Sequence, residues 1–414
     1  MLSDVAITLD DLLPVQRQAV THRAGPLLVV GAAGTGKTSV IEARYQWLVA
    51  VQGVAPERIA LVTPARARAD LLQARLELTL AGGYDELFVL TPVALAVVLL
   101  DGARAGFEAG ESLLEPGDRL AMLLERIDEL SLERHDFGGS ANALLGGLIR
   151  RIDRLKAEAI GAEDYARWAA QLSPESPAAA QEREFAEVYR THERMLAQAG
   201  APDAGDLVLD AIRTVRANAG VRGRFDHVLL DDAQELDLAP MTLVGAVAGE
   251  GLTAAADPAQ ALRRFRGAGA DRVRSLAHGA QVVTLGPSWR CPSRVLRAAD
   301  ALVPVTVEPV SGEGEVGFWR CANDRAQAQS VAADAERLIT REAVAPERIV
   351  IVVPEVAREG RAVAVALEER AVPHRVVGEA AFFQRAEIRD VLAWLRLLAD
   401  ASDAPAVVDR KSVV

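Results

Sequence analysis

Several residue types are scarce in this chain of 414 residues, and each scarcity excludes a class of protein. The two cysteines, Cys291 and Cys321, fit neither a disulfide scaffold nor a metal-binding motif. The longest apolar run, residues 88–100, is interrupted by Thr91 and Pro92 and is too short to span a bilayer. The N-terminal residues carry no basic leader. We therefore expect a protein of the reducing cytoplasm without a membrane partner.

Lysine is also nearly absent, because arginine carries most of the positive charge. Lysine occurs only at Lys37, Lys156 and Lys411, so each is a candidate for a specific role. The 58 acidic residues outnumber the 46 basic ones and give a net charge of −12. The surface as a whole therefore repels a phosphate backbone, and any nucleic-acid contact must be a local groove.

Short apolar runs alternate with helical patterns over most of the chain, which predicts parallel sheets covered by helices on both faces. We expect strands at 25–30, 59–63, 88–90, 228–230, 252–256, 282–285, 316–319, 349–353 and 374–377. Between about 101 and 200 the apolar residues follow helical spacing instead, as in Phe185, Tyr189 and Leu196. This segment therefore predicts an all-helical insertion within an α/β domain.

This pattern divides the chain into four parts. Residues 1–100 and 200–285 are expected to form a first α/β domain, and residues 101–199 the helical insertion. An incomplete second α/β domain is expected at 286–408. A common sequencing-library adapter could encode residues 409–414, so we expect an artificial tail there, with a natural basic tail as the alternative.

A glycine-rich segment after the first expected strand matches a phosphate-binding loop. It comprises Gly31, Ala32, Ala33, Gly34, Thr35, Gly36, Lys37 and Thr38. In such a loop, backbone N–H groups surround a phosphate, the lysine reaches the β and γ phosphates, and the final hydroxyl ligates magnesium. A plain glycine-rich turn is the alternative, but a chance match to all the constrained positions is rare. We predict binding of ATP with Mg²⁺.

A pair of acids follows the expected strand at 228–230. Asp231 is the candidate magnesium ligand, and Asp232 would orient or deprotonate the attacking water. The alternative is an ordinary acidic turn after a buried strand. Neither a zinc-protease helix nor a serine-hydrolase turn occurs in the sequence. A nucleotide kinase or small GTPase is a weaker interpretation, because no substrate or base-recognition motif matches.

With these two motifs, the chain resembles superfamily 1 DNA helicases of the UvrD, PcrA and Rep type from about Leu12 to Val408. Four further segments carry the resemblance, namely 12–20, 203–207, 256–268 and 285–290. Residues 378–390 echo one more. The resemblance implies a RecA-like P-loop NTPase domain with an all-helical insertion and an incomplete second RecA-like domain.

The resemblance also implies a role for individual residues. Gln16 would read the adenine edge, Gln260 would sense the γ-phosphate, and Arg290 would act as an arginine finger. With Asp232, the last two form the expected catalytic set. The expected DNA contacts are Thr63, Thr91 and Phe265. The implied activity is ATP-dependent movement on single-stranded DNA or at a duplex junction, with 3′ to 5′ polarity, in repair or recombination.

Some positions depart from the family pattern. Asp232 replaces a glutamate, which shortens the water-positioning side chain by one methylene. Pro64, Pro92 and Arg263 stand where the family has aromatic residues that stack on DNA. Such losses resemble the weaker motor of the heterodimeric AdnA and AdnB helicase-nucleases. The alternative function is therefore a mainly structural or nucleotide-binding subunit with a helicase-nuclease partner.

The family continues beyond the helix expected at 388–398 with two more motifs, V and VI, that this sequence lacks. We therefore expect a C-terminally truncated motor. An ATP hydrolase is expected of the intact protein, whereas this chain alone is not expected to unwind DNA.

Overall fold

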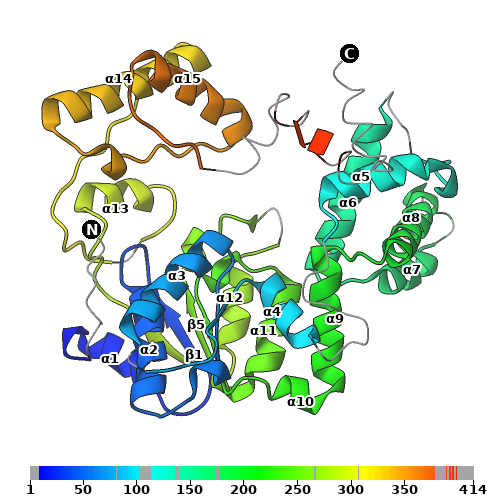
Figure 1. Cartoon of the computed structure of the whole chain (residues 1–414), viewed down its shortest axis with the longest axis horizontal. Helices are drawn as coiled ribbons and strands as arrows, with labels where there is room; N and C mark the ends of the chain where they lie inside the picture. Colours follow the sequence, from blue (N-terminus) through cyan, green and yellow to red (C-terminus); the bar gives the residue numbers. More distant parts are fainter. Residues whose placement is uncertain are drawn as a thin grey trace. The chain divides into compact units, whose positions relative to one another are not determined.

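The structure is a computed structural model of the chain (Figure 1). It describes residues 9–80, 82–101, 113–135, 140–173, 175, 177–264, 267–305 and 307–377, together with 388, 391–392, 394–395 and 398. The chain divides into two compact units, residues 1–316 and 317–414. Each unit is considered by itself.

A six-stranded parallel sheet forms the centre of the first unit, in the order β3-β2-β4-β5-β1-β6. Its strands are β1 (Leu27–Val30), β2 (Ile59–Val62), β3 (Phe88–Leu90), β4 (His227–Leu230), β5 (Leu252–Ala256) and β6 (Gln281–Thr284). Each overlaps a run expected from the sequence. All six carboxyl ends lie at one edge of the sheet, where open α/β sheets bind ligands.

Side chains alternate between two cores on opposite faces of the sheet. Leu27 and Val29 of β1 point into one core, whereas Leu28 points into the other. The first core is covered by α1 (Pro14–Val20), α2 (Lys37–Ala50) and α3 (Arg66–Thr79). The second is covered by α4 (Pro92–Leu100), α9 (Ala204–Ala217), α11 (Leu238–Ala248) and α12 (Ala270–Ala277). Burial on both faces explains why the strands are continuous apolar runs.

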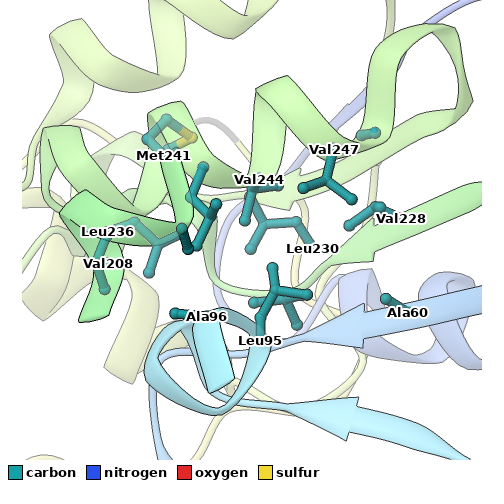
Figure 2. Close-up of a cluster of buried hydrophobic side chains, with 14 of the residues drawn as sticks. Ala60, Leu95, Ala96, Val208, Val228, Leu230, Leu236, Met241, Val244 and Val247 are labelled. Atoms are coloured by element: carbon teal, nitrogen blue, oxygen red, sulfur yellow. The ribbon is translucent and has the colours of Figure 1, made fainter. Parts of the chain in front are cut away.

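Figure 2 shows the second core in detail. Leu230 of β4 and Ala60 of β2 meet Leu95 of α4 and Val244 of α11. Two further helices described in this unit outside the insertion are α10 (Ala219–Arg222) and α13 (Ser293–Asp300). The packing holds β2 and β4 side by side, so that the residues following them lie next to each other.

Among its described residues, the segment of the expected insertion contains helices and no strand. It contains α5 (Pro116–Glu125), α6 (Ala141–Ala157), α7 (Ala162–Gln171) and α8 (Pro177–Ala199), and it has its own hydrophobic core. Lys156 at the end of α6 is buried, and its Nζ lies 2.7–2.8 Å from carboxylate oxygens of Glu193, Asp203 and Asp206. This ammonium group links α6 and α8 of the insertion to α9 of the sheet domain.

The second unit contains α14 (Asp324–Glu342) and α15 (Arg361–Glu369), which share a small apolar core. The strands expected at 316–319, 349–353 and 374–377 do not form among its described residues, which are extended there without a ladder. Val350 and Val352 remain exposed. An apolar run becomes a strand only when a neighbouring strand satisfies its backbone groups, and local sequence does not supply that neighbour.

The change of unit falls between Val316 and Gly317, whereas the sequence interpretation places the change of domain at residue 286. Residues 288–309 account for the difference, because Ser288 and Trp289 bond to the loop that follows β1. The domain boundaries remain a prediction. The expected tail, 409–414, lies outside the described residues.

Candidate nucleotide-binding site

The phosphate loop connects β1 to α2 at the carboxyl edge of the sheet. Gly34 and Gly36 have φ angles of 78° and 89°, in the left-handed region that favours glycine. A Cβ atom at Gly34 would lie only 2.6 Å from Ser288 Oγ, so a side chain there would also collide with its neighbour. Thr35 is buried and its hydroxyl donates to Ala32 O at 2.9 Å. These features hold the loop in the shape that the sequence predicts.

Lys37 folds back over the loop in this structure. Its Nζ donates to Gly31 O at 2.8 Å and to Ala32 O at 3.0 Å. Burial lowers the pKa of Lys37, while the nearby carboxylates of Asp257, Asp232 and Asp231 oppose that shift. The Lys37 ammonium group is thus bonded to the backbone of its own loop.

Thr38 and Asp231 form the expected metal-binding pair. The Thr38 hydroxyl donates to Asp231 Oδ2 at 2.8 Å across 193 residues of sequence. Asp231 is fully buried, and its Oδ1 has no hydrogen-bond partner among the described residues. Burial and the neighbouring Asp232 charge raise the pKa of Asp231. A buried carboxylate oxygen without a partner, beside a hydroxyl, fits the oxygen ligands that Mg²⁺ prefers.

Arg68 lies against both residues of this pair, although the sequence analysis did not predict it. Its Nη2 donates to Thr38 Oγ1 at 2.8 Å and lies 3.6 Å from Asp231 Oδ2. It comes from the first turn of α3, which follows β2, and β2 is the neighbour of β4. Only the strand order brings it there, so no local motif could have identified it.

The expected catalytic residues Asp232 and Gln260 belong to one polar network. Asp232 adopts a left-handed conformation, with φ 52° and ψ 44°, and its Oδ1 accepts a bond of 3.1 Å from Gln234 Nε2. Gln234 Oε1 in turn accepts from Asp257 N at 2.9 Å. The Gln260 amide donates to Asp257 Oδ2 at 2.5 Å. The ends of β4 and β5 are thus connected beside Lys37.

Gln16 lies against the loop rather than free in solution. Its Nε2 donates to Thr35 O at 3.2 Å, and its Oε1 accepts from Leu13 N at 3.0 Å. This arrangement ties α1 to the phosphate loop. The expected contact with adenine remains a prediction.

A segment after β6 forms one wall of the loop. Ser288 Oγ donates to Ala33 O at 2.7 Å, and Trp289 N donates to Gly34 O at 2.9 Å. Arg290 follows directly, and its charge contributes to lowering the pKa of Lys37. Trp289 was not among the sequence-predicted residues, yet its side chain is half exposed beside the loop. Arg290 therefore lies near the loop, and its role as an arginine finger remains a prediction.

Of the three residues expected to contact DNA, Thr63 is buried and Thr91 caps a helix. Thr63 is fully buried, and its hydroxyl lacks a hydrogen-bond partner within the described part of the chain. The Thr91 hydroxyl accepts from Ala94 N at 3.3 Å and caps α4. Phe265 lies outside the described residues. Their roles remain predictions.

A parallel sheet with a phosphate loop after β1 and a buried acid after β4 defines a RecA-like P-loop NTPase domain. Comparison with protein families narrows this class. The UvrD/REP helicase N-terminal domain matches residues 12–280, and the UvrD-like helicase C-terminal domain matches residues 291–409. The chain belongs to the UvrD/REP helicase family.

Individual relatives agree with this assignment. ATP-dependent DNA helicase PcrA of Bacillus subtilis (strain 168) is 27% identical over 414 residues, which cover 95% of this chain and 54% of the relative. ATP-dependent DNA helicase UvrD1 of Mycobacterium tuberculosis (strain ATCC 25618 / H37Rv) is 28% identical over 426 residues, which cover 96% of this chain and 53% of the relative. The chain thus spans about half the length of these relatives. None of the described helices is long and apolar enough to cross a membrane.

Proposed function

We propose that this chain is the motor portion of an ATP-dependent DNA helicase or translocase that couples ATP hydrolysis to movement on single-stranded DNA. The observation that carries the proposal is the meeting of Lys37, Thr38, Asp231 and Arg290 around one phosphate loop. DNA as the substrate is supported by the names of the PcrA and UvrD1 relatives. Polarity from 3′ to 5′, a role in repair or recombination, and a cytoplasmic location are finer parts of the same proposal.

In this proposal each residue acts on the triphosphate. The loop N–H groups and the Lys37 ammonium hold the β and γ phosphates, which requires Lys37 to leave the Gly31 and Ala32 carbonyls. The Thr38 hydroxyl and the Asp231 carboxylate hold Mg²⁺, which supplies charge neutralisation when bound.

Hydrolysis then depends on the polar network beside the loop. Asp232 orients the attacking water and accepts its proton, and Gln234 fixes the carboxylate by its bond to Oδ1. Gln260 sits between Asp257 and the phosphate region and can report the γ-phosphate. Arg290 adds positive charge near Lys37, where it can stabilise the charge that builds up in the transition state.

The experiment is an ATPase assay with and without single-stranded DNA on the full-length protein. We expect DNA to stimulate hydrolysis, and Lys37→Ala to abolish both the basal and the stimulated rate. Arg66→Ala is a matched control, because Arg66 lies on α3 at the same edge of the sheet but is exposed and pairs with Asp70 of its own helix. An intact nucleotide affinity without any DNA-stimulated hydrolysis would overturn the motor proposal.

That same result would favour the second candidate, a nucleotide-binding subunit of a heterodimeric helicase-nuclease. The observation behind this candidate is Asp232, whose shorter side chain is already bonded to Gln234. Copurification with a nuclease subunit, together with ATP binding but no turnover, is the expected outcome for it.

A further inference from the structure

Three charged side chains, Glu42, Arg68 and Arg75, line the contact between α2 and α3 and lead to the candidate metal pair. Thr38 and Glu42 lie one turn apart on α2, and Arg68 and Arg75 lie two turns apart on α3, so each pair shares a helix face. Glu42 is buried, and Arg75 Nη2 lies 2.8 Å from its Oε2. The row runs from solvent at Arg75 to the buried Asp231.

Arg68 lies beside two oxygens, Thr38 Oγ1 and Asp231 Oδ2, of the residues that would hold a metal ion. The Thr38 hydroxyl has a single hydrogen, which it gives to Asp231, and it uses a lone pair to accept from Arg68 Nη2. A metal ion needs a lone pair of the same oxygen and the same carboxylate. A guanidinium at this distance would also repel a divalent cation. The resident arginine therefore opposes the ion in two ways, by its bond to the Thr38 hydroxyl and by its positive charge near Asp231.

Glu42 offers Arg68 a second position. Neither carboxylate oxygen of Glu42 has a hydrogen-bond partner among the described residues, because the contact from Arg75 is close but poorly aligned. The positive charge of Arg68 already acts on Glu42, where it opposes the rise in pKa caused by burial. The Arg68 side chain is 30% exposed, so it is not locked in place by packing. A buried carboxylate with free acceptor capacity, one helical turn from Thr38, can receive a displaced guanidinium.

We propose that Arg68 is a positioning residue that holds the Thr38–Asp231 pair in the nucleotide-free protein and moves toward Glu42 when Mg²⁺ enters with the nucleotide. The inference rests on the proposed nucleotide function. Its consequence is that magnesium must displace a resident cation, so the protein requires more magnesium than the oxygen ligands alone would demand. In return, the buried Asp231 is never left without a nearby positive charge.

The test measures binding rather than turnover. A fluorescent N-methylanthraniloyl ATP is titrated into the 414-residue chain at increasing Mg²⁺, and again in EDTA. For Arg68→Ala and Arg68→Gln we expect the half-saturating Mg²⁺ concentration to fall about tenfold, as one nearby opposing charge is removed. Affinity in EDTA should not rise, so the gain is specific to magnesium. Arg66→Ala, two residues away on α3, should behave as the unchanged protein.

Glu42→Gln supplies the second arm. Because this substitution removes the second position for the Arg68 guanidinium, it should raise the Mg²⁺ requirement when Arg68 is present. Combined with Arg68→Ala, it should have no effect, and a double-mutant cycle measures this difference. Arg68→Gln keeps a donor for Thr38, so it isolates the charge if Arg68→Ala fails to fold. An unchanged or higher Mg²⁺ requirement in both Arg68 variants overturns the inference while leaving nucleotide binding intact. No nucleotide binding by the unchanged chain at any Mg²⁺ concentration overturns the proposed function as well.

Discussion

Asp232 combines an unusual backbone with a short carboxylate. Its φ of 52° lies in the left-handed region, which aspartate adopts more readily than most residues with a Cβ. Its Oδ1 is held by Gln234. If the family's longer side chain is needed to reach the attacking water, this aspartate limits hydrolysis while leaving Asp231 and Thr38 unaffected.

We therefore predict that Asp232→Glu raises ATP turnover in the full-length protein about tenfold, equivalent to roughly 1.4 kcal/mol of barrier. Nucleotide affinity should barely change, because the substitution acts on the water. Steady-state kinetics with single-stranded DNA measure both quantities, and Asp232→Asn, which keeps the size but removes the base, should lower turnover. A lower rate in Asp232→Glu would mean that the backbone has adjusted to aspartate and that its length is not limiting.

Glu42 makes stability depend on pH. Burial raises the pKa of Glu42 from 4.5 to about 7, against the opposing charges of Arg75 and Arg68 and with the help of Asp231. The folded state thus binds a proton that the unfolded state has released. Between pH 4.5 and 7 the free energy of unfolding must fall as pH rises, and the full penalty persists above pH 7.

We predict that Glu42→Gln removes this slope, because glutamine does not titrate. The difference in free energy of unfolding, Glu42→Gln minus the unchanged chain, should therefore grow as pH rises from 4.5 to 8. Each unit of pKa shift corresponds to about 1.4 kcal/mol, so the difference should grow by up to about 3 kcal/mol. Urea denaturation at several pH values measures the difference. Parallel curves for the two proteins would show that Arg75 keeps Glu42 ionised at an ordinary pKa.

At the scale of elements, the buried Lys156 connects three helices. Its ammonium balances Glu193, Asp203 and Asp206, and the pKa of Lys156 is raised by these carboxylates despite burial. Arg119 Nη1 adds a second cation, 2.9 Å from Asp203 Oδ2. Removing one partner from such a cluster leaves buried negative charge uncompensated.

Lys156→Met should therefore lower the free energy of unfolding by about 3–5 kcal/mol, the usual cost of breaking a buried ion pair. Chemical denaturation followed by circular dichroism gives the value. Arg150→Ala, on the exposed side of the same α6, should change it by no more than about 0.5 kcal/mol. A small effect at Lys156 would indicate that Asp206 takes up a proton and that Arg119 alone neutralises the rest.

The elements of the sheet domain were predictable because their signals are local. The apolar runs at β1 and β4 end directly at Gly31 and Asp231, so sequence alone indicated both the strands and the site. The run at 349–353 is as aliphatic as β1 but finds no neighbouring strand among the described residues. Strand formation depends on pairing, and pairing is a property of the whole sheet.

At the scale of the whole molecule, the parts of the site that sequence did not reveal are those that depend on contacts between distant segments. Arg68 meets Asp231 because β2 lies beside β4, and Ser288 meets Ala33 because β6 pairs with β1. Arg68 belongs to no local pattern, and the resemblance of segment 285–290 did not indicate what Ser288 contacts. The family resemblance pointed to Arg290 and Gln260 as candidates. The position of Arg68 beside Thr38 and Asp231 became evident only from the structure.

All the described contacts of the phosphate loop come from the first unit, including those of Gln16, Ser288 and Trp289. We therefore predict that ATP with Mg²⁺ slows amide exchange at residues 31–38 and 288–290 of the 414-residue chain. Exchange in α14 and α15 should stay unchanged, because their core contains no residue of the loop. Hydrogen–deuterium exchange with mass spectrometry measures both regions at once.

Lys37→Ala is the control for this exchange experiment, since the loss of its ammonium should remove the protection at the loop without altering the exchange of α14. Protection within 324–369 that depends on Lys37 would show instead that the second unit contributes to nucleotide binding in this chain. In that case the nucleotide must draw residues of both units to the phosphates, and the site would be larger than the contacts of the first unit indicate.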